Sequence, residues 1–486
     1  MEAQLIEGGL VATDDGWRDV SLMLEGGRIA SLVPPGEGAE RARRVDAAGC
    51  LVMPGLVNGH THSHGALGRG GVPDGAVLET FLSGCGWLNA NRTTDDLRLS
   101  AELSAVELIR KGCTACFDLT VELPGPTVEG IHAVAQAYAD IGLRAVVAPM
   151  IADRTLYEAL PGLLEAFEPP LRDAVAALSL PGWRYVMETC DRAFRDWPVS
   201  QDLVRPGIGP AIPLHCSDDM LRACRDLSRE RAIPLQTHLA ETRLQQVMAR
   251  ARYGTTLTEH LDALGLLSPR FSGAHGVWLS QAEMDLLARH GAGVSHNPTS
   301  NLRLGSGLAP LRRLAAAGVA LGIGTDASNT SDGQNMFEAM RLAATLSRLG
   351  APDPATWVTA GEALAMATTG SAGLMGFERV GRIATGWAAD LLFLDREQSH
   401  YVPLRRPTEQ VVLSETGAGL RRVMIAGRTV LAEGRITTID ERALNARAHA
   451  AAARLSEASE DARLLGAAAA RVVHGFCQTH CAAHPI

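Results

Sequence analysis

The stretch Cys50-Leu-Val-Met-Pro54-Gly-Leu-Val-Asn-Gly-His60-Thr-His62-Ser-His64 joins an apolar strand to a His-x-His pair. In a strand, residues i and i+2 face the same side, so His60 and His62 should project together from the strand end. Two neutral imidazoles on one side of a strand can supply half of a metal site. Taken alone, such a pair is more often two surface or hydrogen-bonded histidines, so the rest of the chain has to decide.

From residue 56 to 379, apolar strands alternate with helical stretches in about eight units. Strand Thr114–Asp118, for example, precedes helix Val128–Ile141, which precedes strand Arg144–Met150. Such alternation predicts an α/β protein with a parallel sheet, and eight units over this length predict a (β/α)8 TIM-like barrel.

Both ends of the chain instead read as short strands. The first 55 residues contain three, with a hairpin signal at Gly26-Gly27, and four more follow residue 380. The seven ranges are Gln4–Gly8, Val20–Glu25, Arg28–Val33, Asp390–Leu394, Gln410–Leu413, Arg421–Ile425 and Thr429–Leu431. We therefore expect residues 1–55 and 380–440 to form one small composite β-sandwich domain beside the barrel of residues 56–379. The alanine-rich segment Asp440–Val473 predicts a C-terminal helical extension over residues 441–486.

Composition narrows the class of protein. Of 486 residues, 46% are apolar and 20% charged, so a large core is expected. The formal net charge of -9 gives no electrostatic reason to expect nucleic acid or an anionic membrane as partner. No apolar stretch reaches the ~18 residues of a membrane span, and the first residues lack a signal-peptide pattern. The nine cysteines are scattered and odd in number, which favours a reduced, cytoplasmic compartment.

Polar residues gather where predicted barrel strands end, the place where barrel enzymes carry their active sites. Of fifteen histidines, five close such strands, and an aspartate closes the last one. A structural role is the better interpretation of any one histidine, but not of the whole set. The pattern therefore predicts a metal site. The residues are His60, His62, His238, His275, His296 and Asp326.

These motifs resemble the amidohydrolase superfamily, in particular its mononuclear-metal deaminases and chlorohydrolases. That branch includes guanine, 8-oxoguanine and adenosine-derivative deaminases and s-triazine hydrolases. The resemblance covers about residues 1–440. It is carried by His60-Thr-His62, His238-Leu-Ala-Glu241, Ala274-His275, Ser295-His296-Asn-Pro-Thr-Ser-Asn301-Leu-Arg-Leu-Gly-Ser-Gly307, Gly324-Thr-Asp326-Ala-Ser-Asn329 and Gly381-Arg-Ile-Ala-Thr-Gly386-Trp-Ala-Ala-Asp390.

The resemblance implies that four residues bind one divalent ion per chain: His60, His62, His238 and Asp326. Imidazoles plus a carboxylate suit catalytic Zn²⁺, with Fe²⁺, Co²⁺ or Mn²⁺ as alternatives. Relatives with two metals bridge them through a carbamylated lysine. The only lysine of this chain, Lys111, falls at a predicted helix end, so we expect a single metal.

The resemblance also implies the catalytic roles. Glu241 would take a proton from the attacking water, His275 would polarise the developing charge, and Asp326 would pass a proton to the leaving group. The alternative for Glu241 is an ordinary residue of a helix N-terminus. We expect a hydrolase that acts on a C–N bond, first of all a deaminase of an aminated N-heterocycle. Hydrolysis of an amide, urea, carbamate, lactone or ring-halogen bond is the alternative, and a non-enzymatic relative a third.

The substrate-binding residues stay unknown at this stage. Nucleoside deaminases of this branch commonly carry Pro-His-x-Pro where this chain reads Pro210-Ala-Ile-Pro213, so a substrate like S-adenosylhomocysteine or methylthioadenosine is not expected. His64 and His296 could each contact substrate or support the site. The tail from His474 to His484 could bind a second metal, but a terminal helix is the preferred interpretation. A homodimer or larger assembly is implied by the resemblance alone.

Overall fold

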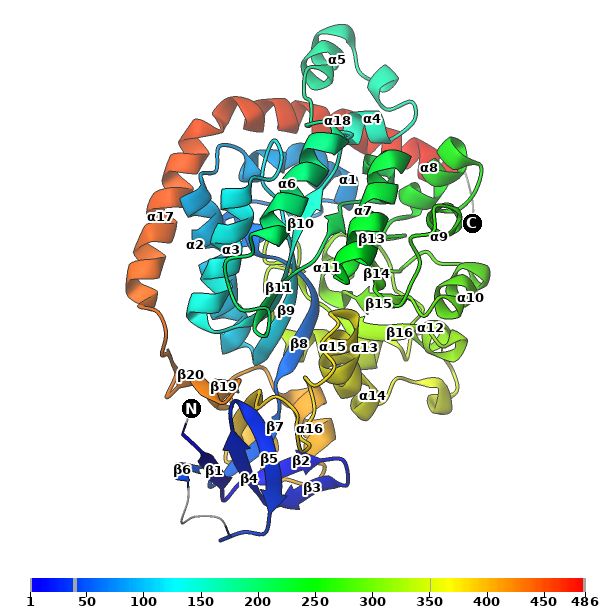
Figure 1. The fold of residues 1–486 in the computed structure, drawn as a ribbon. Coiled ribbons are helices and arrows are strands. Elements are labelled where there is room, and N and C mark those ends of the chain that lie inside the picture. The colour runs from blue at the N-terminus through cyan, green and yellow to red at the C-terminus, as the bar shows by residue number, and fades with distance from the viewer. Residues whose placement is uncertain (1, 38–41, 350, 484–486) are drawn as a thin grey trace.

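The structure is a computed structural model that describes residues 2–37, 42–349 and 351–483. Its centre consists of parallel strands with helices outside them (Figure 1). One sheet has the order β11-β10-β9-β8-β17, with β12 paired to β10, and another has the order β13-β14-β15-β16. The strands are β8 (Leu56–His62), β9 (Cys113–Thr120), β10 (Arg144–Ile151), β11 (Val204–Pro206), β12 (Gly209–Pro210), β13 (Leu235–Leu239), β14 (Phe271–His275), β15 (Gly293–His296), β16 (Ala320–Ile323) and β17 (Asp326–Ala327). The predicted α/β class with parallel strands is confirmed.

These sheets are joined at both edges. A parallel bridge between Ile208 and Leu235 joins the β11–β12 region to β13. At the other side, β17 follows β16 after two residues and pairs with β8, with Asp326 opposite Thr61. The carboxyl ends of β8, β13 and β17 are thereby brought to one place.

The outer helices begin at residues that cap them well. Helix α2 (Thr94–Arg110) starts with a capping box, in which Thr93 Oγ1 accepts from the Asp96 amide and Asp96 accepts from the Thr93 amide. The helix buries Leu97, Leu108 and Ile109 against the sheet, each contributing about 1.5–3 kcal/mol. The same alternation continues through α3 (Val128–Ile141), α6 (Trp183–Arg195), α7 (Asp218–Arg231), α8 (Arg243–Tyr253), α10 (Gln281–Arg289), α12 (Leu311–Ala317) and α13 (Met336–Leu346).

Strands from both ends of the chain share one sheet, as the sequence predicts. Strand β7 (Cys50–Pro54) pairs antiparallel with β18 (Leu391–Asp395) in a sheet ordered β21-β20-β19-β18-β7-β2-β3. A second sheet has the order β5-β4-β1-β6. The other strands are β1 (Gln4–Glu7), β2 (Leu10–Thr13), β3 (Gly16–Asp19), β4 (Ser21–Glu25), β5 (Arg28–Val33), β6 (Arg43–Asp46), β19 (Leu420–Ile425), β20 (Arg428–Ala432) and β21 (Arg435–Ile436).

Strand β7 runs directly into β8, the strand of the His-x-His pair, through Gly55. A Cβ atom at Gly55 would lie 2.0 Å from Thr114 Oγ1, so only glycine fits at this junction. The sheet that both chain ends form therefore leads without a loop into the first strand of the site.

The predicted strand Gln410–Leu413 is wrong. These residues lie in helix α16 (Pro407–Ser414), which has proline in its first turn and buries Val411 and Val412. Proline without an N–H suits a helix start, and a short apolar run does not distinguish a strand from a helix.

The C-terminal extension consists of α17 (Glu441–Ala458) and α18 (Glu460–Ala483). Helix α17 packs beside α2. Helix α18 packs over α1 (Leu78–Gly84) at the end of the molecule opposite the sheets that contain β1 to β7 (Figure 1). Four members of the tail considered for metal binding lie within α18, whereas His484 is outside the described residues. The four are His474, Cys477, His480 and Cys481.

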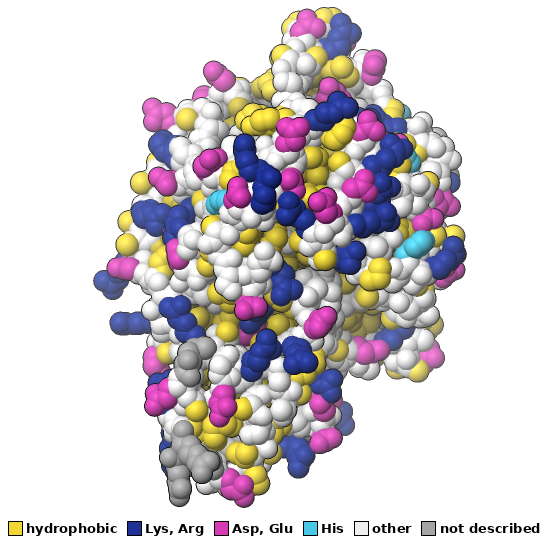
Figure 2. Space-filling model, in the orientation of Figure 1, with side chains coloured by type: hydrophobic (Ala, Val, Ile, Leu, Met, Phe, Trp, Pro, Cys, Tyr) yellow, Lys and Arg dark blue, Asp and Glu magenta, His cyan; other side chains and the backbone are white. Residues whose placement is uncertain are grey.

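The surface mixes charges of both signs. On the face shown in Figure 2, arginine and acidic side chains are interspersed, with apolar atoms between them. Among the described residues, no helix combines the length and apolar character needed to cross a bilayer.

Candidate metal centre and active site

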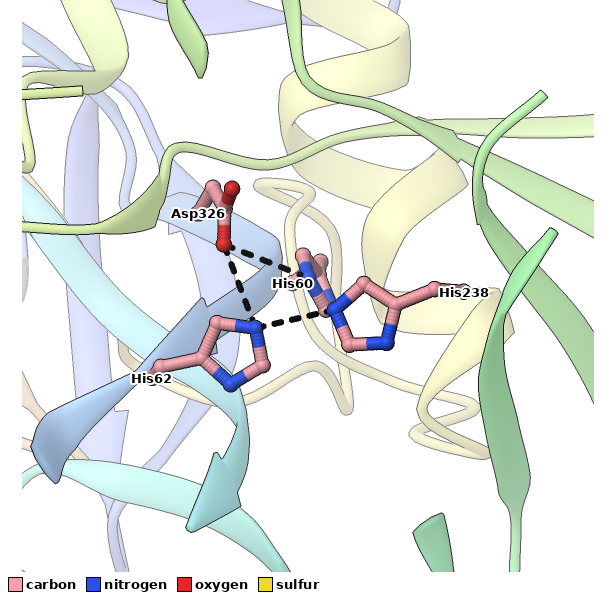
Figure 3. Close-up of side chains that lie close together, drawn as sticks. All are labelled: His60, His62, His238 and Asp326. Atoms are coloured by element: carbon pink, nitrogen blue, oxygen red, sulfur yellow. Dashed lines mark hydrogen bonds and ion pairs between the residues drawn. The ribbon is translucent and has the colours of Figure 1, made fainter. Parts of the chain in front are cut away.

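Four side chains from three strands converge at one end of the parallel strands. His60 and His62 come from β8, His238 from β13 and Asp326 from β17 (Figure 3). One nitrogen or oxygen atom of each lies within 4.8 Å of the corresponding atoms of the others. All four side chains are buried, His60 completely. The structure thus brings together the four residues that the sequence singled out as metal ligands.

The hydrogen bonds of the three imidazoles fix their tautomers. His62 Nδ1–H donates to the Leu119 carbonyl at 2.6 Å, and His238 Nδ1–H donates to the Ala211 carbonyl at 2.6 Å. His60 Nδ1–H donates to Gln236 Oε1 at 2.7 Å. Carbonyl and amide oxygens accept hydrogen bonds and cannot donate them. Each Nδ1 therefore carries the hydrogen, and each Nε2 presents a lone pair to the space between the four side chains. This is the arrangement of metal-binding histidines, whose second nitrogen is held by another group.

The centre requires positive charge. The Nε2 atoms of His62 and His238 are 3.1 Å apart, and His62 Nε2 lies 3.1 Å from Asp326 Oδ1. Two lone pairs this close repel unless a proton or a cation lies between them. Burial lowers the pKa of His62, but the hydrogen bond and charge of Asp326 outweigh it and raise that pKa above its usual value. The donor set and its geometry therefore fit a divalent cation.

Asp326 is held in place from two sides. Its Oδ2 accepts a hydrogen bond from Ser300 Oγ at 2.5 Å, while Oδ1 faces His62 and His60. Burial raises its pKa, yet its contacts with His60 and His62 hold the pKa of this carboxyl well below its usual range. Its φ of 63° is left-handed, which is uncommon for a residue other than glycine and typical of active sites.

Glu241 follows β13 after one residue, Ala240, whose φ of 49° turns the chain. The Glu241 amide donates to Gln245 Oε1 at 2.9 Å, which fixes the backbone. Its carboxylate is buried, and neither oxygen has a hydrogen-bond partner within the described part of the chain. Burial, followed by the charges of Asp326 and Glu79, raises the pKa of Glu241 well above its usual value. A buried acid without a partner is unusual in a structural role, so this side chain is available to a ligand.

His275 is the neighbour of that carboxylate. Its Nε2 lies 3.6 Å from Glu241 Oε2, and its Nδ1 lies 2.8 Å from Asn301 Oδ1. Burial lowers the pKa of His275 to about 4, so the ring is neutral near pH 7. A neutral imidazole beside a protonatable carboxyl can exchange or orient protons on a bound molecule.

The other residues considered from sequence take different positions. His64 is buried, its ring centroid is 5.1 Å from that of His62, and its Nδ1 accepts from the Val121 amide at 3.2 Å. Burial lowers the pKa of His296 to about 3, and its Nδ1 has no partner among the described residues. Lys111 lies at the C-terminal end of α2, where the sequence predicts it.

Sequence reasoning missed the residues that hold this site. Ser300 and Asn301 lie inside the quoted motif that follows His296, so their presence near the site had a signal. Gln236 had none, because glutamine carries no catalytic pattern and its partner His60 lies 176 positions away. Asp118 did have a signal, because it closes the predicted strand Thr114–Asp118. It accepts from the Ser63 amide at 2.7 Å and from Tyr138 OH at 3.0 Å.

Comparison with known proteins identifies the family. The sequence profile of the amidohydrolase family matches residues 51–430. The chain belongs to the amidohydrolase family. This amidohydrolase is 34% identical over 452 residues to a 5-methylthioadenosine/S-adenosylhomocysteine deaminase of Desulforudis audaxviator. The aligned region covers 92% of this chain and 97% of that protein.

Two solved structures are also similar. An adenosine deaminase from Xanthomonas campestris with bound zinc has a TM-score of 0.82 and 27% identity over 93% of this chain and 98% of its own. An atrazine chlorohydrolase from Arthrobacter aurescens complexed with zinc has a TM-score of 0.82 and 26% identity over 92% of this chain and 100% of its own. The expectation of an amidohydrolase-type hydrolase that acts on C–N bonds is confirmed. Zinc in both neighbours, together with the four-residue group of this chain, supports a divalent metal.

Proposed function

We propose that this amidohydrolase catalyses hydrolytic deamination, releasing ammonia from the exocyclic amine of an N-heterocycle. The observation that carries the proposal is the buried Glu241 carboxylate. It has no partner among the described residues, lies 3.6 Å from His275, and follows His238 by three residues. Deamination needs a group that takes a proton from water and returns it to a ring nitrogen, and this carboxylate is suited to both steps.

In this proposal His60, His62, His238 and Asp326 hold one divalent ion. Three neutral nitrogens and one carboxylate oxygen suit Zn²⁺, with Fe²⁺, Co²⁺ and Mn²⁺ as alternatives, because such ligands do not select sharply. When bound, the ion supplies Lewis-acid chemistry and lowers the pKa of water toward about 7.

The side chains perform the proton transfers. Glu241 accepts the first proton from the attacking water and delivers it to the ring nitrogen next to the amine-bearing carbon. Neutral His275, whose Nδ1–H is held by Asn301 Oδ1, offers Nε2 as an acceptor that orients the O–H of the attacking water. Asp326, with its Oδ2 held by Ser300, passes the second proton to the departing amine, which leaves as ammonia.

The substrate class is an aminated purine-like or related ring. The relatives named as adenosine-derivative deaminases support this class. Residue 211 argues for a different substrate within this class. It is alanine, and it contributes only its carbonyl, which accepts a hydrogen bond from His238. Hydrolysis of a ring-halogen bond is the second candidate, favoured by the likeness to the atrazine chlorohydrolase.

We infer three further features: the closure of the barrel, the domain bounds and the assembly. The strand pairings fit a closed (β/α)8 barrel of residues 56–379, beside a β-sandwich domain of residues 1–55 and 380–440 and a helical extension of residues 441–486. A cytoplasmic homo-oligomer without nucleic-acid or membrane partners remains the expectation from sequence.

The test is ammonia release by the metal-replete enzyme on a panel of purine, adenosine-derivative, pterin and triazine amines. Chlorinated triazines without an amine form a second arm, scored by chloride. Ammonia from at least one ring amine, lost after chelation and restored by Zn²⁺, is the expected result. Chloride release alone would replace deamination by the second candidate, and no product from either arm would overturn both.

A further inference from the structure

Gln236 lies on β13 two residues before His238, so both side chains face the same side of the strand. The side chain is completely buried and makes three hydrogen bonds. Its Nε2 donates to the Gly59 carbonyl at 3.0 Å and to Ser272 Oγ at 3.0 Å, and its Oε1 is 2.7 Å from His60 Nδ1. Because the Gly59 carbonyl only accepts, the amide nitrogen must face it. Oε1 therefore faces His60.

This orientation determines which nitrogen of His60 carries the hydrogen. An amide oxygen accepts, so Nδ1 has to donate to it and Nε2 keeps its lone pair. His60 Nε2 has no hydrogen-bond partner within the described part of the chain and lies 3.6 Å from Asp326 Oδ1. In the other tautomer, two acceptors would face each other across 2.7 Å, and an N–H would point at the centre instead of a lone pair.

We propose that Gln236 is a positioning residue that sets the tautomer and ring orientation of His60 for a divalent ion. The inference rests on the metal site of the proposed function. His62 and His238 are held by the carbonyls of Leu119 and Ala211, and a backbone carbonyl persists whatever its side chain. Among the described partners of the three Nδ1 atoms, only that of His60 is a side chain. Substituting Gln236 should therefore disturb the ligand His60 while all four proposed metal ligands remain in the chain.

The neutral amide also suits the charge of the site. Asp326 and Glu241 are both buried here, so a third carboxylate would add desolvation cost and repulsion. A glutamine accepts the His60 hydrogen without adding charge, and it anchors its own position through two donated hydrogen bonds. Strand β13 therefore supplies one ligand, His238, together with the support of another, His60.

The experiment compares Gln236→Met with Gln246→Met. Gln246 on α8 is a matched control, because it is also buried and its Nε2 also donates twice, to the Trp278 carbonyl and to Glu283. Dissociation constants for Zn²⁺ are measured by competition with a chromophoric chelator, and the visible spectrum of the Co²⁺-loaded protein reports ligand geometry. We expect Gln236→Met to weaken Zn²⁺ binding about 10- to 100-fold and to alter the Co²⁺ spectrum. Gln246→Met should leave both unchanged.

A second variant separates positioning from a general loss of folding. Gln236→Glu keeps an acceptor opposite His60 Nδ1 and should bind Zn²⁺ more tightly than Gln236→Met, despite losing two donated hydrogen bonds. Wild-type Zn²⁺ affinity and Co²⁺ spectrum in Gln236→Met would overturn the proposal, as would equal losses in both methionine variants. Ammonia release takes no part in this test. Absence of Zn²⁺ binding by the wild-type protein would overturn the metal site and this proposal with it, whereas tight binding without deamination would overturn only the proposed reaction.

Discussion

Glu241 and His238 lie three residues apart but should fail in different ways when replaced. Glu241→Gln keeps the shape of the side chain and leaves the four proposed metal ligands unchanged. It removes the proton carrier, so turnover should fall by about 10²–10⁴-fold while metal content stays at one ion per chain. His238→Ala removes a member of the cluster, so metal and turnover should both be lost. Metal analysis beside kcat distinguishes them. Full activity in Glu241→Gln would disprove its role in proton transfer.

His296 should contribute measurably to the dependence of the protein's folding stability on pH. Burial, followed by the charge of His275, lowers its pKa to about 3, against 6.5 for an exposed histidine. The unfolded chain then binds a proton between these values that the folded chain does not, so stability falls as pH falls below 6.5. Between pH 6.5 and 4.5 this histidine should cost the metal-free protein roughly 2–3 kcal/mol.

Chemical denaturation of the metal-free wild type and of His296→Gln across this range measures the effect. The variant should show a shallower loss of stability below pH 6.5, since it has one fewer buried group to protonate. Parallel curves for the two proteins would show that His296 is not the group responsible.

Single residues also show what sequence can reveal about a site. The ends of the predicted strands pointed to six residues, because parallel strands bring their carboxyl ends together. The resemblance to the amidohydrolases then selected four of them as ligands: His60, His62, His238 and Asp326. Gln236 was not identifiable in this way, because its importance depends on contacts with Gly59, Ser272 and His60 that only the folded chain creates. Residue chemistry predicts ligands well and their supports poorly.

At the scale of elements, long periodic segments were predicted well: the helix expected over Val128–Ile141 is α3, with the same bounds. Short apolar runs were less reliable. Val411 and Val412 read as strand residues, but Pro407 starts a helix that buries them. Helix α13 was missed altogether. Its burial depends on partners such as α14 (Ala360–Ala365) and α16, which lie elsewhere in the sequence.

The packing of α18 on α1 gives an element-scale prediction. A Cβ at Gly466 would lie 2.9 Å from the Ser83 carbonyl and 3.1 Å from the Gly84 carbonyl, which are backbone atoms and cannot move aside easily. Alanine normally stabilises a helix interior by roughly 0.5–1 kcal/mol over glycine. Here we expect Gly466→Ala to destabilise by about 1–3 kcal/mol through overpacking.

Gly475 on the same helix is the control, because nothing lies within 4 Å of its Cβ position. Gly475→Ala should be neutral or slightly stabilising. Thermal unfolding measures the total effect, and hydrogen exchange in α18 shows whether this helix opens first. Equal effects of the two substitutions would mean that α18 does not depend on close contact with α1.

For the whole molecule, a buried ion pair links the parallel strands to the sheet formed by both chain ends. Arg144 begins β10, and its Nε donates to Asp390 Oδ2 at 3.0 Å just before β18. Asp390 Oδ1 also accepts from the Ala426 amide at 2.7 Å, next to β19. Both charges are almost fully buried, so each depends on the other for compensation.

Removing one member of that pair should therefore cost far more than breaking an exposed one. Asp390→Asn leaves the Arg144 guanidinium buried without its counter-charge, and we expect a loss of about 3–5 kcal/mol. Asp14→Asn breaks the pair between Asp14 and Arg382, which are both about half exposed, and should cost at most about 1 kcal/mol. Urea unfolding followed by two probes, tryptophan fluorescence and far-UV circular dichroism, measures both variants. If the pair couples the two parts of the fold, we expect the two transitions to coincide in the wild type and to separate in Asp390→Asn. A small and single shift, equal to that of Asp14→Asn, would mean that the two sheets are joined by packing between β7, β8 and β18 and not by this charge pair.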